Sequence, residues 1–369
     1  VTVGTAGSVA TLNFVGGSVV AIASSGAAGV ATITVSGIST NNLRADGQEN
    51  LYAGTNAGAA SDSDTCFNIG LGFKALSSAN EGDDNIAIGS SAAQLLTSGS
   101  RNIVLGKFTM DCAAVTGSNN IALGSNSSKC MTTGCSNIAI GSNSLQCCMS
   151  TGLHNIAIGC MAGRKLQNNC NIAIGFQALL GNGGGIGNCN IAIGRYAGRK
   201  LTNGHSNIFM GTSAGQSITG SGSADGSYNI GFGREALGGS ADGGSTSGNF
   251  NAVMGHYSGR KISSGSSNTL IGRVAGCSIT SGGTNTFLGS GSGKSVSTGS
   301  KNIAIGKDVT PPSNTGNCQL VIGIESYSWM VGNCDFNVGI GTTNPNAPVG
   351  AGNTNKLSVG ILSAYQLYG

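Results

Sequence analysis

The chain of 369 residues is poor in charge, proline and aromatic side chains. Only 9% of its residues are charged and 5% are aromatic, with four prolines and one tryptophan. Disordered chains combine low hydrophobicity with high charge, whereas 39% of these residues are hydrophobic, so composition excludes a disordered chain. A net charge of +4 spread over the whole length excludes a typical basic nucleic-acid binder. The sequence also contains no apolar run of about 18 residues that could span a membrane as a helix.

Glycine is the residue in excess, with 65 copies. Collagen is excluded because glycine does not recur at every third position and proline is scarce. A pentapeptide instead recurs 17 times, mostly at steps of 17 residues: asparagine, aliphatic, small, aliphatic, glycine. Seven copies are strict, and they begin at Asn85, Asn120, Asn137, Asn155, Asn171, Asn190 and Asn302. Their closing glycines are Gly89, Gly124, Gly141, Gly159, Gly175, Gly194 and Gly306.

The repeat length predicts the fold. Five residues closed by glycine suit one short strand, and an aliphatic residue at position eleven, counting the asparagine as zero, suits a second. A unit of this length is too short for a helical repeat and is typical of one coil of a β-solenoid. We therefore expect an all-β protein: a parallel β-solenoid, or β-roll, of about 17 coils over residues 50–341. Residues 1–49 are expected to form a small β cap or connector, and residues 342–369 a C-terminal strand and linker that continues past Gly369 in the full-length protein.

Each position of the pentapeptide has an expected role. Stacked asparagines predict an amide ladder along the rod, and the glycine supplies a positive φ at the corner. Side chains alternate along a strand, so we expect the aliphatic residues at positions one and three to fill the core of the coil. Position two would then face outward, and because it is apolar we expect it to be buried between copies of the chain in a homotrimer. The residues assigned to this trimer interface are Ala87, Ala122, Ala139, Ala157, Ala173 and Ala192.

The repeats resemble two kinds of fibre. The unit Asn-Ile-Ala-Ile-Gly is similar to the β-roll heads of trimeric autotransporter adhesins and to repeat-rich appendage proteins of tailed bacteriophages, especially those of marine cyanobacteria. The 17-residue spacing, the scattered cysteines and the segment 337–345, which resembles the closing segment of many phage fibre shafts, favour the phage family. The resemblance implies a non-enzymatic structural fibre on the virion surface, outside the cell, that spaces or presents receptor-binding parts.

The partners that this implies are other copies of the chain, other virion or fibre components, and a host cell-surface glycan or protein, with no nucleic acid and no insertion into a membrane. The alternatives are a bacterial trimeric surface adhesin or extracellular filament subunit and, third, a polysaccharide-degrading spike.

No catalytic, cofactor or metal site is expected. The segment 290–295 resembles a phosphate-binding loop, but the glycine required six residues before Lys294 is Leu288. The 12 cysteines form no CxxC pair, and most are expected to be small buried thiols, with disulfides and a metal site as alternatives. The three histidines fall in different repeat positions, and Asp62, Asp64 and the pair 83–84 are expected in exposed turns rather than as facing catalytic carboxylates.

Two surface features remain as candidates for binding. The pairs 164–165, 199–200 and 260–261, each arginine followed by lysine, fall at equivalent positions and read either as solubilising charge or as contacts to an anionic cell surface. Long steps between repeats predict protruding loops at 181–189, 217–228 and 238–250, either as tolerated insertions or as receptor contacts.

Overall fold

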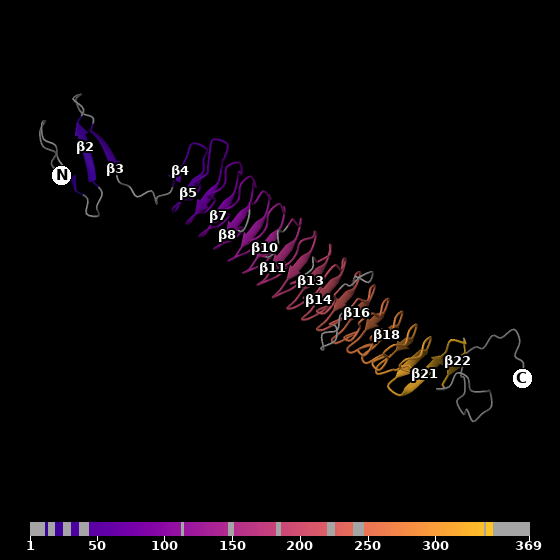
Figure 1. Ribbon diagram of the computed structural model, residues 1–369. Coiled ribbons are helices and arrows are strands. Elements are labelled where there is room, and N and C mark those ends of the chain that lie inside the picture. Colours follow the sequence, from indigo (N-terminus) through magenta and orange to yellow (C-terminus); the bar gives the residue numbers. More distant parts are fainter. Residues whose placement is uncertain are drawn as a thin grey trace, which may run out of the picture.

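The computed structural model describes residues 12–13, 19–24, 31–36, 44–111, 114–146, 151–181, 186–219, 226–238, 247–335 and 337–341 (Figure 1). The first strands, β1 (Leu12–Asn13), β2 (Val19–Ser24) and β3 (Ala31–Ser36), form a small antiparallel sheet. Strand β4 (Arg44–Ala45) pairs antiparallel with β5 (Leu51–Ala53), where the solenoid begins.

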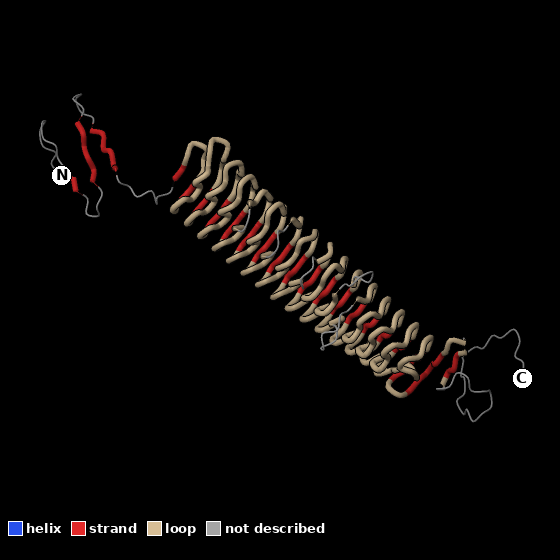
Figure 2. The backbone as a smooth tube through the Cα atoms, viewed as in Figure 1, coloured by secondary structure: helices blue, strands red, loops and turns tan. Residues whose placement is uncertain are grey.

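The body of the protein is a parallel β-solenoid in which each coil contributes one strand of three residues to a long sheet (Figure 2). Sixteen strands, β5 to β20, pair in parallel and in sequence order, and the coils between them make fifteen turns. After β5 they are β6 (Ile69–Leu71), β7 (Ile86–Ile88), β8 (Ile103–Leu105), β9 (Ile121–Leu123), β10 (Ile138–Ile140), β11 (Ile156–Ile158), β12 (Ile172–Ile174), β13 (Ile191–Ile193), β14 (Ile208–Met210), β15 (Ile230–Phe232), β16 (Ala252–Met254), β17 (Thr269–Ile271), β18 (Thr286–Leu288), β19 (Ile303–Ile305) and β20 (Leu320–Ile324). The predicted fold class is confirmed.

The repeat sets the register of this sheet. Ala139 pairs with Ala122 on one side and with Ala157 on the other, so equivalent positions stack into straight columns. Neighbouring strands lie about 4.8 Å apart, which makes the fifteen turns a rod on the order of 70 Å long.

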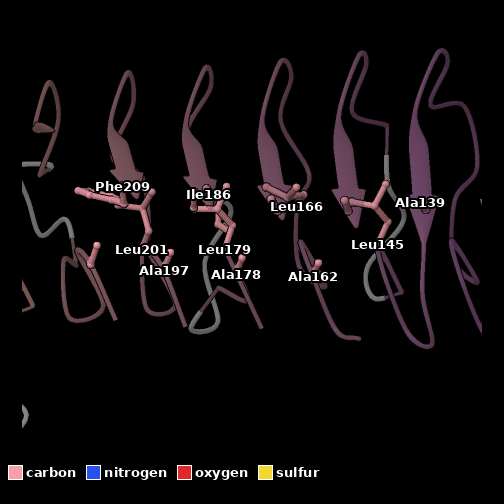
Figure 3. Packing of buried hydrophobic residues seen from close by; sticks show 14 of the residues in the cluster. Ala139, Leu145, Ala162, Leu166, Ala178, Leu179, Ile186, Ala197, Leu201 and Phe209 are labelled. Carbon is pink, nitrogen blue, oxygen red and sulfur yellow. The ribbon is translucent and has the colours of Figure 1, made fainter. Parts of the chain in front are cut away.

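The hydrophobic core is a narrow column inside the coils (Figure 3). Position two of each strand, such as Ala139, is fully buried. Around it pack the residues at positions seven and eight, such as Ala162 and Leu145, and the aliphatic residue at position eleven, such as Leu166. Where position two is Phe209, its neighbour Gly215 leaves room: a Cβ at Gly215 would lie 2.5 Å from the ring. The core is therefore filled by compensating large and small residues.

The predicted second strand of each coil is not found among the described residues, where that place shows isolated bridges such as the one between Leu96 and Val115. Positions five to ten instead form turns, with left-handed residues at positions six and eight, such as Asn143 (φ 57°) and Leu145 (φ 45°). Alternating left-handed residues curl the chain, so the aliphatic side chain at position eleven points into the core without an extended backbone.

The parallel stack ends at the C-terminal side in an antiparallel arrangement. Strand β21 (Tyr327–Gly332) pairs antiparallel with β20, and β22 (Val338–Ile340) pairs antiparallel with β21. The copy of the repeat at Asn337 therefore forms no further parallel coil, which is one reason why the solenoid has fewer turns than the 17 copies suggested. Residues 342–369 lie outside the described residues, and the domain boundaries at 49 and 341 stay predictions.

Candidate functional site

An asparagine ladder runs inside the rod along one edge of the sheet. The side-chain oxygen Oδ1 of Asn137 accepts two hydrogen bonds from Asn155, one from its backbone N–H (2.9 Å) and one from its Nδ2 (3.1 Å). Asn137 in turn donates in the same way to Oδ1 of Asn120, at 2.9 and 3.1 Å. All seven asparagines expected in the ladder occupy it and are buried.

Most of the ladder asparagines also close their own coil. Nδ2 of Asn137 donates to the carbonyl oxygen of Gly152 at 2.8 Å, across the turn that leads to the next strand. The side-chain amide of Asn137 thus joins two neighbouring coils and holds the turn that leads to the next strand. Its oxygen and its nitrogen both have hydrogen-bond partners.

Both ends of the ladder carry a different residue. At the C-terminal end Gln319 replaces asparagine and still donates from its backbone N–H (2.8 Å) and Nε2 (3.3 Å) to Oδ1 of Asn302. At the N-terminal end Asp46 accepts from the backbone N–H (2.9 Å) and Nδ2 (3.0 Å) of Asn50. Asp46 caps the ladder, and sequence reasoning missed it because it precedes the first repeat.

The seven closing glycines all have φ between +123° and +136°, a region closed to other residues. Close stacking adds a second constraint. A Cβ on Gly141 would lie 2.7 Å from the carbonyl carbon and oxygen of Gly159 in the next coil. The corner therefore requires glycine for both its backbone conformation and its space.

The expected trimer interface is wrong in its residues. Ala87, Ala122, Ala139, Ala157, Ala173 and Ala192 are all fully buried inside the chain's own coils. The residues on either side of them face outward: Ile138 is partly exposed, and Ile140 is 36% exposed. The reason is parity: position two lies on the same strand face as the asparagine at position zero, whose amide ladder is inside the rod.

The outward residues at positions one and three form what we call the apolar face, two columns of mainly isoleucine, leucine and methionine along the sheet from β6 to β20. Several of these side chains are strongly exposed, including Ile88 (42%), Met210 (41%) and Met254 (43%). At one border of this face Tyr228 stacks on Phe250, with ring centroids 5.0 Å apart and an angle of 3° between the planes. A face of this length exceeds the few hundred Å² of contiguous apolar surface usual on a monomer.

The segment that resembles a phosphate-binding loop is part of the repeat. In the segment 290–295, Ser292 donates to the carbonyl of Ala304 at 2.7 Å and Lys294 pairs with Asp308 at 2.8 Å, so the segment is an ordinary turn of the solenoid. Within the described ranges no group of three or more histidine, cysteine or acidic side chains could hold a metal ion.

The cysteines are not the buried thiols that the sequence suggested. Among the described residues, Cys170, Cys189 and Cys334 are exposed free thiols, and Cys66, Cys135, Cys160, Cys277 and Cys318 are free and partly exposed. A hydrogen bond with Cys318 raises the pKa of the Cys334 thiol, and burial raises that of Cys66. Cysteines 112, 130 and 147 fall at equivalent positions of three consecutive repeats, which predicts that they stack, but residues 112 and 147 lie outside the described ranges.

Comparisons with family models, with curated proteins and with solved structures found no match. In the part of the chain that the structure describes, there is no helix able to cross a membrane. The predicted loops at 181–189, 217–228 and 238–250 lie partly outside the described residues.

Proposed function

We propose that this chain is a structural fibre protein whose solenoid forms the shaft of a phage tail fibre or other virion appendage, as a trimer of identical chains. The observation that carries the proposal is the apolar face, which extends from β6 to β20 with polar side chains only at Thr269 and Thr286. A surface about 70 Å long and on the order of 10 Å wide offers roughly 700 Å² per chain, close to one side of a standard stable interface.

The partner that fits this face best is another copy of the chain. The apolar columns repeat at the strand spacing of about 4.8 Å over their whole length. Only a partner with the same repeat and the same length can cover them evenly, and a second copy has both. The resemblance of the repeats to trimeric fibre shafts supports three copies around one axis.

The assembly is tested with two outward substitutions three coils apart, Ile88→Glu with Ile140→Glu. We expect the native chain to sediment at three times its mass of 36.2 kDa and this variant to sediment as a folded monomer, because each carboxylate would be buried without a partner at the interface. The control is Ser90→Glu with Ser142→Glu, which adds the same charge to the same two coils outside the apolar face and should stay trimeric. A native monomer would overturn the assembly, and a native dimer would overturn the trimer.

Whether the fibre belongs to a virion is tested by electron microscopy of a culture that produces the protein, labelled with gold-tagged antibody against the chain. We expect gold on an appendage of the virion. Gold on bacterial envelopes would refute the virion assignment and support the surface adhesin.

A further inference from the structure

Most of the positively charged side chains of this protein lie along one edge of the rod. Fourteen of the 18 lysines and arginines lie at positions five, six, nine and ten, in the turns that follow the strands. We call this the basic edge; its cations are Lys74, Lys107, Lys129, Arg164, Lys165, Arg195, Arg199, Lys200, Arg234, Arg260, Lys261, Arg273, Lys294 and Lys307. Only four acidic residues share it, Asp111, Glu235, Asp308 and Glu325.

The middle of the basic edge carries uncompensated charge. Residues 112–224 contain no aspartate or glutamate at all, and the six lysines and arginines of this stretch all lie on the basic edge. Further along, Glu235 pairs with Arg260 at 2.9 Å, and the last two cations, Lys294 and Lys307, each pair with a carboxylate. Like charges on neighbouring coils repel one another, so solubility alone gives no reason to sort them in this way.

Aromatic rings hold the cations in place. Arg195 and Arg199 both lie over the ring of Tyr196, at 4.6 and 5.0 Å from its centroid, and Phe176 of the preceding coil contacts that ring edge-on at 5.5 Å. The arrangement recurs three coils further on, where Arg234 and Arg260 lie over Tyr257 at 5.5 and 4.8 Å. Guanidinium groups held in this way lose less freedom when they bind an anion.

The backbone beneath them is equally fixed. The N–H of Tyr196 donates to the carbonyl of Phe176 at 3.0 Å, and the N–H of Tyr257 donates to that of Arg234 at 3.0 Å. Two polar atoms on the basic edge, Arg164 Nε and, five coils further on, His256 Nε2, are buried without a hydrogen-bond partner within the described residues. The basic edge is thus a regular, pre-organised row of cationic groups.

We propose that the basic edge binds an anionic polysaccharide laid along the rod, with Arg195 and Arg199 at Tyr196 as its main contacts. A polymer with carboxylate or sulfate groups at regular intervals matches a row of cations that recurs on every second coil from Asn120 to Asn190. Single-stranded nucleic acid fits less well, because it needs open aromatic rings on which bases can stack, whereas these rings are covered by arginine. The inference names a ligand class for the proposed shaft and so extends that proposal, but it rests on the surface of this chain alone.

The test is affinity electrophoresis of the full chain in native gels that contain polygalacturonate, dextran sulfate or neutral dextran. We expect retardation by one or both anionic polymers, none by dextran, and loss of retardation in 1 M salt, where the screening length falls to about 3 Å. Polygalacturonate reports a carboxylate-bearing ligand and dextran sulfate a sulfated one. The variant Arg195→Gln with Arg199→Gln should bind about 25-fold more weakly, since each cation near an anionic surface contributes on the order of a factor of five.

The control is Arg101→Gln with Lys301→Gln, which removes the same charge from exposed residues at the other end of the strands and should bind like the native chain. Equal weakening by both variants would mean a net-charge effect and would overturn the proposal, as would tighter binding to oligo-dT than to either anionic glycan. Absence of retardation in every gel would overturn it too. None of these results changes the sedimentation test, so the shaft proposal stands or falls separately.

Discussion

The asparagine ladder predicts that one buried amide in the middle of the rod supports two neighbouring coils. Consider Asn137→Leu, which keeps the size of the side chain and removes its polar atoms. The backbone N–H of Asn155 loses its acceptor at 2.9 Å, and the carbonyl of Gly152 loses its donor at 2.8 Å. A buried group left without a partner costs about 1–3 kcal/mol, so the two together should lower the stability of these coils by roughly 2–6 kcal/mol.

The measurement that suits this change is hydrogen exchange, because coils of a stacked repeat open locally and exchange reports which coils are weakened. We expect faster exchange at the amides of residues 137–156 in the variant, with the coils beyond residue 285 unchanged. The control is Ser142→Ala, which removes an exposed hydrogen bond at 2.9 Å from the same coil and should change local stability by less than about 0.5 kcal/mol. Unchanged exchange in Asn137→Leu would show that the ladder does not hold the coils together.

Three further predictions concern single positions. Gly141→Ala should lower the melting temperature strongly, because residue 141 has φ +126° and an added Cβ would lie 2.7 Å from the next coil. The control Gly47→Ala should not lower it, because a Cβ there would have no atom within 4 Å. Equal effects of the two substitutions would contradict the stacking argument. Ala139→Leu should destabilise the folded chain by about 1–3 kcal/mol through overpacking, and a neutral result in chemical denaturation would contradict its inward orientation. Burial raises the pKa of the Asp111 carboxyl. Its ionised form therefore destabilises the folded chain once the pH rises above the usual pKa range of an aspartate. Asp111→Asn should therefore raise the melting temperature at pH 7 relative to the native chain and lose this advantage near pH 3; a gain that is the same at both pH values would refute this cause.

The sequence by itself determined the solenoid. A pentapeptide at steps of about 17 residues allows little except stacked coils, and it also specified the asparagine ladder and the glycine corners, because each depends on residues in equivalent positions of neighbouring coils. These are local requirements repeated along the chain, so a single sequence reveals them.

The tertiary structure decided which side of the strand faces inward. Ile138, Ala139 and Ile140 are all apolar, so hydrophobicity alone could not say whether the isoleucines or the alanine fill the coil. The deciding fact is that the asparagine at position zero is buried, because alternation along the strand then turns position two inward as well. Ala139 therefore lies inside the coil, and the isoleucines lie on the apolar face. The sorting of cations onto one edge likewise became visible only when the turns placed positions five to ten together along the rod.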